Sequence, residues 1–555
     1  LIINNRLIEK TKIDHKLNHI QSKIILSRNF SDEEIFSIKN DLNFKNPFLN
    51  TKDFLKACDL IKEHIINKDN ILVIGDYDVD GCVSTSLMVN FLKKNKSKVN
   101  YYIPDRFKDG YGASQNLVIK LIIVYKPKLI IFLDCGSSSY EALEFIKSKK
   151  ISSLVIDHHN TQKPYPLSDI FLNPKKDVEY KRYDYLCSSF LTYLFIDVYI
   201  KKNKLKISLT NEQIYVILAT VADVMPIRDM NRLLALKVLK NFDITKNFIF
   251  SYIFNILEQK KKLELDDLGY IIAPIFNSAG RLDNANQIVD LLTSNSEKRK
   301  IHILNKIIEL NKKRKLVQKR CLKDLDFTNL SKKKGVLIIY DMNIPEGIIG
   351  IIASKIKDYY NKPCIVFTNS NNIIKGSARS TLDFNIGEYI QKASNSKILI
   401  RGGGHNLAAG VSLTKSNLIL FEKFLNNYYE KINKFFKKFY ISKILLESIN
   451  RTFFDNVKIL GPFGNKNPNP IFLIEQIKII KPKIIKEKFI SCFIKKNNKI
   501  IKGISFWDLN TKISYELLNS KNNFDIFVNI RQNKWNNKSS IELEIIDLIQ
   551  NTNKT

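Results

Sequence analysis

The stretch ILVIGDYDVDG, residues 71–81, decides the fold. Its first half, ILVIG, is an apolar run typical of a buried strand, and three carboxylates follow it at once, on Asp76, Asp78 and Asp80. Like charges this close repel one another strongly unless a cation neutralises them or water surrounds them. The stretch therefore predicts either a metal-binding strand end or a solvated acidic or calcium-type loop, and the surrounding sequence has to decide between these.

On both sides of this stretch, short apolar runs alternate with helical patterns. Residues 99–104, 129–136 and 152–157 are predicted strands, a helix is expected to begin near Ser84, and residues 141–150 form another helix. Such alternation is typical of a parallel sheet, in which ligands bind beyond the carboxyl ends of the strands. The acidic stretch is expected at that edge of the sheet.

Further segments bring carboxylates and imidazoles to the same edge. They supply Asp134, Asp157, His158, His159 and, from TVADVMP (220–226), Asp223. Each has a simpler explanation, since Asp134 could cap a helix and Asp223 could pair with Arg228. Four separate segments that deliver such groups to one edge nevertheless favour a shared metal site.

The chemistry of these side chains indicates which metal and which reaction. The set is rich in carboxylates, has few imidazoles and has no thiol, which favours Mg²⁺ or Mn²⁺. Five or more ligands allow two ions, and ions about 4 Å apart can hold an attacking hydroxide and stabilise the leaving oxygen of a phosphodiester. The predicted reaction is phosphoester hydrolysis.

Composition narrows the class of protein. Of 555 residues, 44% are apolar and 26% charged, which excludes a mostly disordered chain or a disulfide scaffold. With 89 basic and 55 acidic side chains the net charge is +34, which favours nucleic acid as a partner, although a general enrichment in lysine accounts for part of it. Seven cysteines without CxxC spacing indicate a reduced, cytoplasmic protein, and no apolar run reaches the roughly 18 residues of a membrane span.

Several motifs together identify a family. GDYDVDG, LDCGSSS, the Asp-His-His triplet and TVADVMP resemble the DHH phosphoesterase superfamily. Further motifs narrow the resemblance to the RecJ family of single-strand-specific DNA exonucleases, across nearly the whole chain. They are RFKDGYGAS (106–114), PIFNSAGRLDNA (274–285), KGSARS (375–380), GGGHNLAAG (402–410) and GPFGNKNPNPIF (461–472).

The resemblance, together with the sequence patterns, predicts an α/β fold in five parts. A parallel-sheet DHH phosphoesterase domain is joined by a long helix to a smaller α/β DHH-associated domain, and an OB-like β-barrel that binds nucleic acid follows. The expected bounds are 1–45 for an N-terminal helical segment, 46–295 for the DHH domain, 296–330 for the connecting helix, 331–432 for the DHH-associated domain and 433–555 for the barrel.

By the same resemblance, the protein is expected to be a single-stranded-DNA-specific 5′→3′ exonuclease that uses Mg²⁺ or Mn²⁺, with two ions, in recombination and repair. The metal ligands would be Asp76, Asp78, Asp134, His158 and Asp223. His159 would hold the phosphate or assist proton transfer, Asp157 would orient the imidazoles, and Asp80 would brace the acidic loop behind the ligands.

Other matching positions are expected to bind phosphate and DNA: Arg106, Asn277, Arg281, Ser377, Arg379, Gly403, Gly404 and His405. An arginine can grip a terminal phosphate with two parallel hydrogen bonds, and a glycine-rich turn can present backbone N–H groups to it. In the barrel, Phe463, Phe472, Phe506 and Trp507 either stack on bases or fill the core.

The resemblance also implies binding partners, and it leaves two alternative functions open. The family implies single-stranded DNA as substrate, and a single-strand-binding protein and a helicase as partners, with a monomer as the default. Ile344, Pro345, Ile275 and Cys135 depart from the family's Trp, His, Arg and Asn, so weakened activity is expected. Two alternatives stay open: a silent DNA-binding scaffold, and a DHH phosphodiesterase acting on short oligonucleotides.

Overall fold

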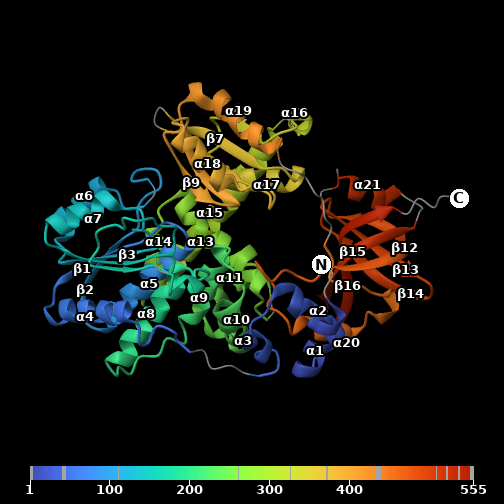
Figure 1. Ribbon diagram of the computed structural model, residues 1–555, viewed down its shortest axis with the longest axis horizontal. Helices are drawn as coiled ribbons and strands as arrows, with labels where there is room; N and C mark the ends of the chain where they lie inside the picture. Colours follow the sequence, from blue (N-terminus) through green and yellow to red (C-terminus); the bar gives the residue numbers. More distant parts are fainter. Residues whose placement is uncertain are drawn as a thin grey trace.

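In a computed structural model of the chain, the described residues form three separate β-sheets (Figure 1). The described residues are 4–40, 45–110, 112–176, 178–259, 262–325, 327–370, 373–431, 439–507, 509, 511–519, 523–535 and 538–550. In this part of the chain no helix is long and apolar enough to cross a membrane.

The first sheet is parallel throughout, as predicted, with strand order β2-β1-β3-β4-β5. Its strands are β1 (Asn70–Ile74), β2 (Lys98–Tyr102), β3 (Leu129–Leu133), β4 (Ser152–Ile156) and β5 (Ile170–Leu172). One face packs on α4 (Lys52–Ile66), α5 (Val79–Lys94) and α8 (Ser188–Lys202), and the other on α6 (Gln115–Tyr125) and α7 (Tyr140–Ser148). All five strands therefore point their carboxyl ends toward one edge.

Helix α5 begins at Val79, not near Ser84 as expected. The Asp78 side chain caps the helix by accepting a hydrogen bond from the Gly81 N–H at 3.0 Å. An aspartate at this position satisfies an otherwise unpaired N–H and starts the helix at once. Asp76 and Asp78 of the acidic stretch therefore precede the helix, whereas Asp80 lies in its first turn.

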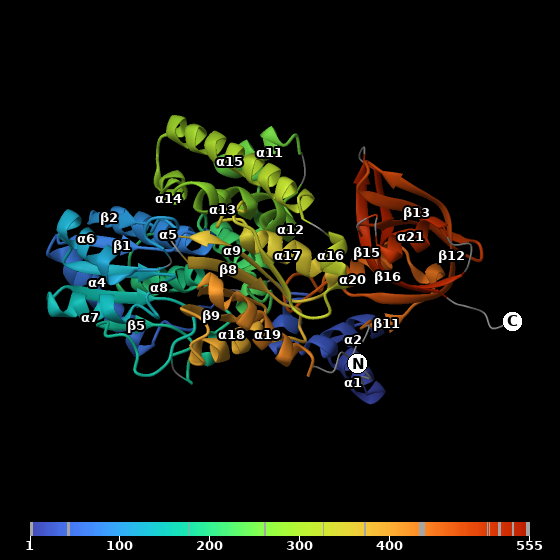
Figure 2. The same cartoon turned by 90° about the horizontal axis from the view of Figure 1, so that it is seen from above.

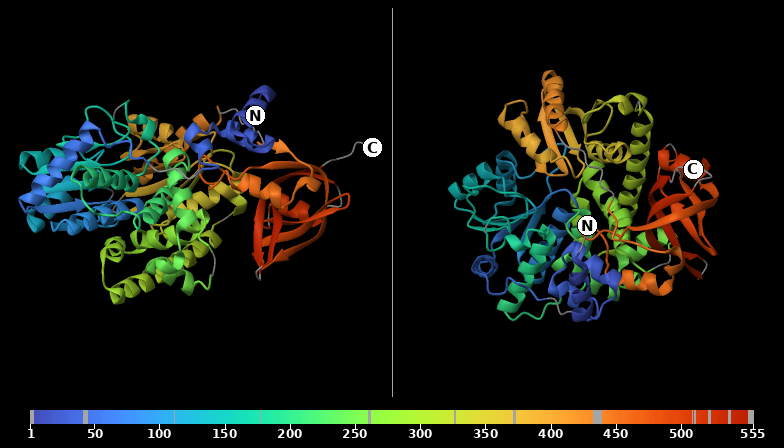
Figure 3. Two further views of the ribbon diagram at one scale, coloured as in Figure 1. Left: turned by 90° about the horizontal axis from the view of Figure 1, so that it is seen from below. Right: turned by 45° about the vertical axis from the view of Figure 1, so that its right-hand side comes forward.

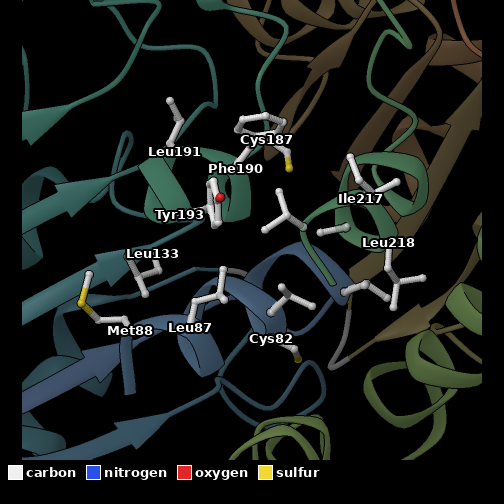
Figure 4. Packing of buried hydrophobic residues seen from close by; sticks show 14 of the residues in the cluster. Cys82, Leu87, Met88, Leu133, Cys187, Phe190, Leu191, Tyr193, Ile217 and Leu218 are labelled. Carbon is white, nitrogen blue, oxygen red and sulfur yellow. The ribbon is translucent and has the colours of Figure 1, made fainter. Parts of the chain in front are cut away.

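The core beneath the sheet edge is formed by α5, α8 and α9 (Gln213–Ala222). Figure 4 shows Cys82 and Leu87 of α5, Phe190 of α8 and Ile217 of α9 in this core. All four side chains are buried. Because this core is close-packed, it fixes the starting points of three helices relative to the strand ends.

A helical region follows the sheet and leads to the second domain. It comprises α10 (Asp229–Asn241), α11 (Phe248–Ile256), α12 (Leu265–Asp267), a π-helical turn η3 (Leu268–Ile272), α13 (Ala273–Leu282), α14 (Asn286–Thr293), α15 (Glu297–Lys323) and α16 (Phe327–Lys332), with 3₁₀ turns η1 (Lys181–Tyr183) and η2 (Ile244–Lys246). The long helix α15 runs along this region (Figure 2). It ends at Lys323, short of the expected 296–330, where Asp324 forms a cap.

The second sheet is mixed, with order β6-β7-β8-β10-β9. It contains β6 (Leu337–Tyr340), β7 (Cys364–Ser370), β8 (Ile373–Arg379), β9 (Arg401–His405) and β10 (Ala408–Leu413), with α17 (Ile349–Tyr360), α18 (Ile386–Asn395), the turn η4 (Lys415–Asn417) and α19 (Leu418–Tyr429). This is the smaller α/β unit that the sequence predicts.

The third sheet closes into the predicted barrel, since β12 pairs with both β13 and β15. It contains β11 (Ser442–Lys443), β12 (Phe472–Ile485), β13 (Phe489–Lys496), β14 (Lys499–Ser505), β15 (Phe524–Trp535) and β16 (Lys538–Gln550), with η5 (Leu446–Ser448), α20 (Arg451–Lys458) and α21 (Lys512–Asn519). The barrel lies at one end of the molecule (Figure 3).

The N-terminal helices lie against the barrel side of the molecule (Figure 1). They are α1 (Asn5–His15), α2 (His19–Arg28) and α3 (Asp32–Phe36). Ile24 and Ile25 share a core with the barrel, while the buried Glu34 carboxylate accepts hydrogen bonds from the guanidinium of Arg228, the residue that precedes α10. This segment therefore joins the barrel to the helical region next to the first sheet.

Candidate metal and phosphate site

The predicted metal-binding side chains meet at the carboxyl edge of the first sheet. Asp76 follows β1, Asp134 follows β3 and His158 follows β4, while Asp223 forms the C-cap of α9. The His158 Nε2 atom lies 3.4 Å from Asp134 Oδ1, 3.5 Å from Asp223 Oδ2 and 3.9 Å from Asp80 Oδ2. Asp223 does not pair with Arg228, because Arg228 pairs with Glu34. Asp134 does not cap the following helix, because Ser139 occupies the N-cap position of α7.

Three overlapping groups of ligand atoms lie within 4.8 Å of one another in the described residues. They are Asp76, Asp78 and Asp134; Asp80, His158 and Asp223; and Asp134, His158 and His159. Asp134 belongs to two of them and adopts a φ of +60°, a left-handed conformation that aspartate tolerates better than most residues. The shared Asp134 suits a ligand that bridges two neighbouring cations.

The electrostatics of this edge fit divalent cations. The Oδ1 atoms of Asp76 and Asp134 are buried and have no hydrogen-bond partner among the described residues, although buried carboxylates are normally paired. Burial and the neighbouring Asp78 raise the pKa of Asp76 to about 7. Burial and the Asp80 carboxylate raise the pKa of Asp223 well above its usual value. Oxygen-rich ligands with one or two imidazoles match Mg²⁺ or Mn²⁺.

Asp80 has a bracing position. Its two carboxylate oxygens accept hydrogen bonds from the Ser188 and Ser189 N–H groups, both at 2.8 Å, at the start of α8. A carboxylate at a helix N-terminus satisfies unpaired N–H groups and is stabilised by the helix dipole. Asp80 thereby locks α5 to α8 directly behind the cluster.

Asp157 orients one imidazole, not both as the sequence suggested. Its Oδ1 atom accepts from the His159 Nδ1–H at 2.8 Å, whereas His158 donates only its backbone N–H and its Nδ1 is without a partner in the described residues. Burial opposes the charge on His159, but Asp157 outweighs it and raises the pKa of His159 to about 9. Burial and the neighbouring His159 charge lower the pKa of His158 to about 3, which suits a neutral metal ligand.

Basic side chains adjoin the acidic loop. The Arg106 guanidinium lies over the Tyr77 ring, 3.9 Å from its centroid, and donates to the Gly280 carbonyl at 3.3 Å. A Cβ at Gly280 would approach the Tyr77 carbonyl oxygen to 2.2 Å, so only glycine allows this packing of α13 on the loop. Arg106 is thereby held beside the metal-binding edge.

A second basic group comes from the smaller domain. The Arg379 guanidinium donates to Ser377 Oγ at 2.9 Å, and a Cβ at Gly350 would come within 2.9 Å of both Arg379 Nη2 and Ser377 Oγ. Burial and the charge of Arg106 lower the pKa of Arg379, so the two guanidinium groups are close enough to repel. Ser377, Arg379 and the first turn of α17 thus form a cradle that suits an anion.

The glycine-rich hairpin β9–β10 of the smaller domain contacts the loop that follows the Asp-His-His triplet. The Asn160 Nδ2 atom lies 3.4 Å from His405 Nδ1, so the two α/β units touch beside the Asp-His-His triplet. At Gly403 an added Cβ would meet nothing within 4 Å, whereas Gly404, at a φ of +158°, packs against the Ala408 carbonyl. Gly403 therefore leaves open backbone, and Gly404 shapes the turn.

Asn277 and Arg281 lie on α13 and line a cavity of about 410 Å³, which also contacts Val224, Arg314 and Phe463. Arg281 donates to the Gly347 carbonyl at 3.1 Å, and burial together with Arg106 lowers its pKa to about 10. The structure therefore places Asn277 and Arg281 next to the loop that follows Asp223.

Sequence reasoning missed several residues of the site. The Asn173 Nδ2 atom donates to Ser137 Oγ and to the His159 carbonyl, and its position after β5 could have identified it. Ser188 and Ser189 carry no motif signal. Arg314 is buried in the basic helix α15, where nothing distinguishes it from its exposed neighbours.

The aromatic candidates separate into core and surface. Phe472 is fully buried in the barrel, so of the two alternatives it fills the core, while Phe506 and Trp507 are exposed. At the positions that depart from the family pattern, Ile344, Ile275 and Cys135 are buried among apolar residues.

Comparisons with known proteins agree with this architecture. The chain matches the models of the DHH family N-terminal domain over residues 70–222, the DHHA1 domain over 333–438 and the RecJ OB domain over 442–547. The fold and site thus define a metal-dependent phosphoesterase of the DHH class with an added oligonucleotide-binding barrel.

Individual relatives narrow the class. The chain is 30% identical over 396 residues to the single-stranded-DNA-specific exonuclease RecJ of Haemophilus influenzae, across 67% of this chain and 68% of that protein. It is 28% identical to RecJ of Bacillus subtilis, across 82% of this chain and 58% of that longer protein. The crystal structure of RecJ with Mn²⁺ from Thermus thermophilus superimposes with a TM-score of 0.84 at 19% identity, over 99% of this chain and 78% of that one. The chain belongs to the RecJ family.

The raised pKa of Asp76 predicts a pH-dependent stability of the metal-free protein. A carboxyl whose pKa is higher in the folded than in the unfolded state stabilises the fold while protonated, and this contribution is lost as pH rises through the folded pKa. In chelator, the unfolding temperature should fall as pH rises from about 4 to about 7 and level off above that, and Asp76→Asn should flatten the fall.

Asp14→Asn, an exposed change on α1, is the matched control and should keep the parental slope. Thermal unfolding followed by circular dichroism across this pH range makes the measurement. An Asp76→Asn protein with the same slope as the parent would show that Asp76 does not carry the buried proton.

Proposed function

We propose that this protein hydrolyses single-stranded DNA from its 5′ end with two divalent cations, and acts in recombination and repair. The observation that carries the proposal is the junction of an acidic, metal-fitting sheet edge with an arginine cradle from a second domain. Arg106 stacks on Tyr77 within the acidic loop, and the second domain contacts the first through Arg281 with the Gly347 carbonyl and through Asn160 with His405.

In this proposal the cations are held by Asp76, Asp78, Asp134, His158 and Asp223. When bound, they would activate water and stabilise the leaving oxygen of the phosphodiester. Asp157 fixes the ring of His159 by the 2.8 Å hydrogen bond at Nδ1, and we assign to this imidazole the role of holding a phosphate oxygen or assisting proton transfer. Asp80 keeps the acidic loop in place through α8.

The 5′ end would occupy the arginine cradle. Arg379 and Arg106 offer planar donors that match phosphate oxygens, and Ser377 with the backbone of Gly403, Gly404 and neighbouring His405 completes the set. Because the cradle adjoins the metal edge, a strand anchored there presents a nearby phosphodiester to the cations. This arrangement supports cleavage close to the 5′ end.

The rest of the strand would run past Asn277 and Arg281 toward the barrel. The contact between Asn160 and His405 brings the two α/β units together beside the metal edge, which supports a passage for one strand and not for a duplex. Exposed Phe506 and Trp507 are candidates for base stacking on the barrel, and the net charge of +34 suits a phosphate backbone.

The wider setting is part of the same proposal. We retain the five expected domains, with the connecting helix ending at Lys323, a monomer, and a single-strand-binding protein and a helicase as partners. All seven cysteines are unpaired, which supports a reducing compartment such as the cytoplasm.

Degradation of a 3′-labelled single strand and of the matching duplex, with Mn²⁺, with Mg²⁺ and with chelator, tests the function. Metal-dependent shortening of the single strand alone, from its 5′ end, is expected. Asp134→Ala should reduce the rate by at least about 100-fold, because Asp134 is shared by two ligand groups, while DNA binding in chelator stays near parental.

Binding without degradation in the parent would indicate a silent scaffold. Degradation of dinucleotides alone would indicate a phosphodiesterase for short oligonucleotides. Asp134→Ala with parental turnover would overturn the metal assignment.

The cradle predicts a preference for a 5′-phosphate that depends on Arg379. Arg379→Ala should lower the ratio of rates on 5′-phosphorylated and 5′-hydroxyl strands by about 10-fold, since one charge-assisted pair contributes roughly 1.5–3 kcal/mol. Arg320→Ala, which removes the same charge from a side chain that is 86% exposed, is the control. An unchanged ratio in Arg379→Ala would rule out the cradle as the phosphate site.

A further inference from the structure

The motif GPFGNKNPNPIF forms a tight turn ahead of the barrel. Gly464 and Asn467 exchange two backbone hydrogen bonds, at 2.8 and 3.1 Å, which close the turn around residues 465 and 466. The fully buried Asn467 side chain donates to the carbonyls of Leu460 and Pro462 and accepts from the Arg28 guanidinium of α2. The turn is therefore fixed from three sides.

Asn465, at the tip of this turn, forms hydrogen bonds with the loop that follows Asp223. The Asn465 side chain donates its Nδ2–H to the Val224 carbonyl at 2.5 Å, and the Asn465 carbonyl accepts from the Ile227 N–H at 2.8 Å. One residue thus bonds to both ends of the segment 224–227. A Cβ at Gly464 would approach Ile227 Cγ1 to 2.6 Å, so glycine is what allows the turn to come this close.

The backbone of the segment 224–227 is strained at its first residue. Val224 has a φ of +55°, a left-handed conformation that is a genuine outlier for a β-branched residue. Its side chain is 66% exposed, so apolar packing does little to hold it there. Two backbone hydrogen bonds at the end of α9, from the Val224 N–H to the Val221 carbonyl and from the Met225 N–H to the Thr220 carbonyl, close the helix around this residue. The two hydrogen bonds with Asn465 add a contact from outside the DHH domain that helps to hold Val224 in this conformation.

Val224 directly follows Asp223, so its conformation sets the path by which the chain leaves the metal-binding edge. Asp223 lies at the carboxyl end of α9, where the helix dipole disfavours a negative charge, and it faces Asp80 across His158. Before a cation binds, these charges push the Asp223 carboxylate away from the cluster. A fixed backbone immediately after Asp223 opposes that movement.

We propose that Asn465 is a positioning residue, which holds Asp223 at the metal site and so links cation affinity to the seating of the segment that leads into the barrel. The proposal rests on the metal site of the proposed function and adds a contribution from outside the DHH domain. Asn465 touches neither substrate nor metal in this scheme and acts only through the backbone of Val224 and Ile227.

Calorimetric titration of the full-length protein with Mn²⁺ tests the proposal. Asn465→Ala should weaken binding at the site that includes Asp223 by about 10-fold, the lower end of what residues supporting a metal ligand contribute. The Mn²⁺ concentration for half-maximal nuclease activity should rise in parallel, while kcat at saturating Mn²⁺ stays within about two-fold of the parent. The rise in unfolding temperature on adding Mn²⁺ should be smaller.

Lys466→Ala is the matched control, because it changes the other residue of the same turn tip, where the side chain is exposed. It should bind Mn²⁺ as the parent does. DNA affinity in chelator should be the same for all three proteins, which shows that the barrel is intact.

The outcomes separate this proposal from the function it rests on. A parent that binds no Mn²⁺ would overturn the metal site itself. A parent that binds Mn²⁺ and an Asn465→Ala protein with equal affinity would overturn the positioning role alone. Equal weakening by Asn465→Ala and Lys466→Ala, or an equally lowered unfolding temperature in chelator, would also overturn it, because the turn would then serve only general stability.

Discussion

Mutual repulsion among carboxylates gathered at one sheet edge is the constraint on which the rest of the structure depends. Asp76, Asp134 and Asp223 are brought together by strand ends and a helix end, and without counter-charge the crowded carboxylates of this edge oppose their ionisation. The scaffold holds this arrangement through contacts that do not depend on a cation. They are the α8 N-terminus on Asp80, the His159 ring on Asp157 and the Asn465 turn on the loop after Asp223.

Next to this acidic edge, basic side chains repel one another. Arg281 and Arg379 lie close enough to Arg106 that its charge, together with burial, lowers the pKa of both. Cations favour ionised carboxylates on one side, and a phosphate favours charged guanidinium groups on the other. The two regions also compensate each other directly, because the Arg106 charge favours ionised Asp76 and the Asp78 carboxylate favours charged Arg281.

Much of this could be predicted from the sequence, because parallel strands bring their carboxyl ends to one edge. That rule alone placed Asp76, Asp134 and His158 together. Capping was harder to predict: Asp78 starts α5 five residues before the expected position. The role of Asp157 was half right, since ring orientation depends on χ angles that a sequence does not reveal.

Contacts between residues far apart in the chain could not be predicted from the sequence. Asn465 meets Val224 across 241 positions, and Arg28 meets Asn467 across 439, so no local pattern relates them. The N-terminal helices were expected as a separate segment, yet they share a core with the barrel. The smaller domain's motifs were recognisable by resemblance, but their position against Asn160 is a product of packing between domains.

The central claim is that this edge binds two cations around the shared Asp134. Anomalous diffraction from crystals grown with Mn²⁺ tests it most directly. The account predicts two peaks about 4 Å apart, one beside Asp76 and one beside His158 and Asp223, with Asp134 between them. No peak at this edge under saturating Mn²⁺, or a single peak that leaves Asp223 and His158 uncoordinated, would contradict it.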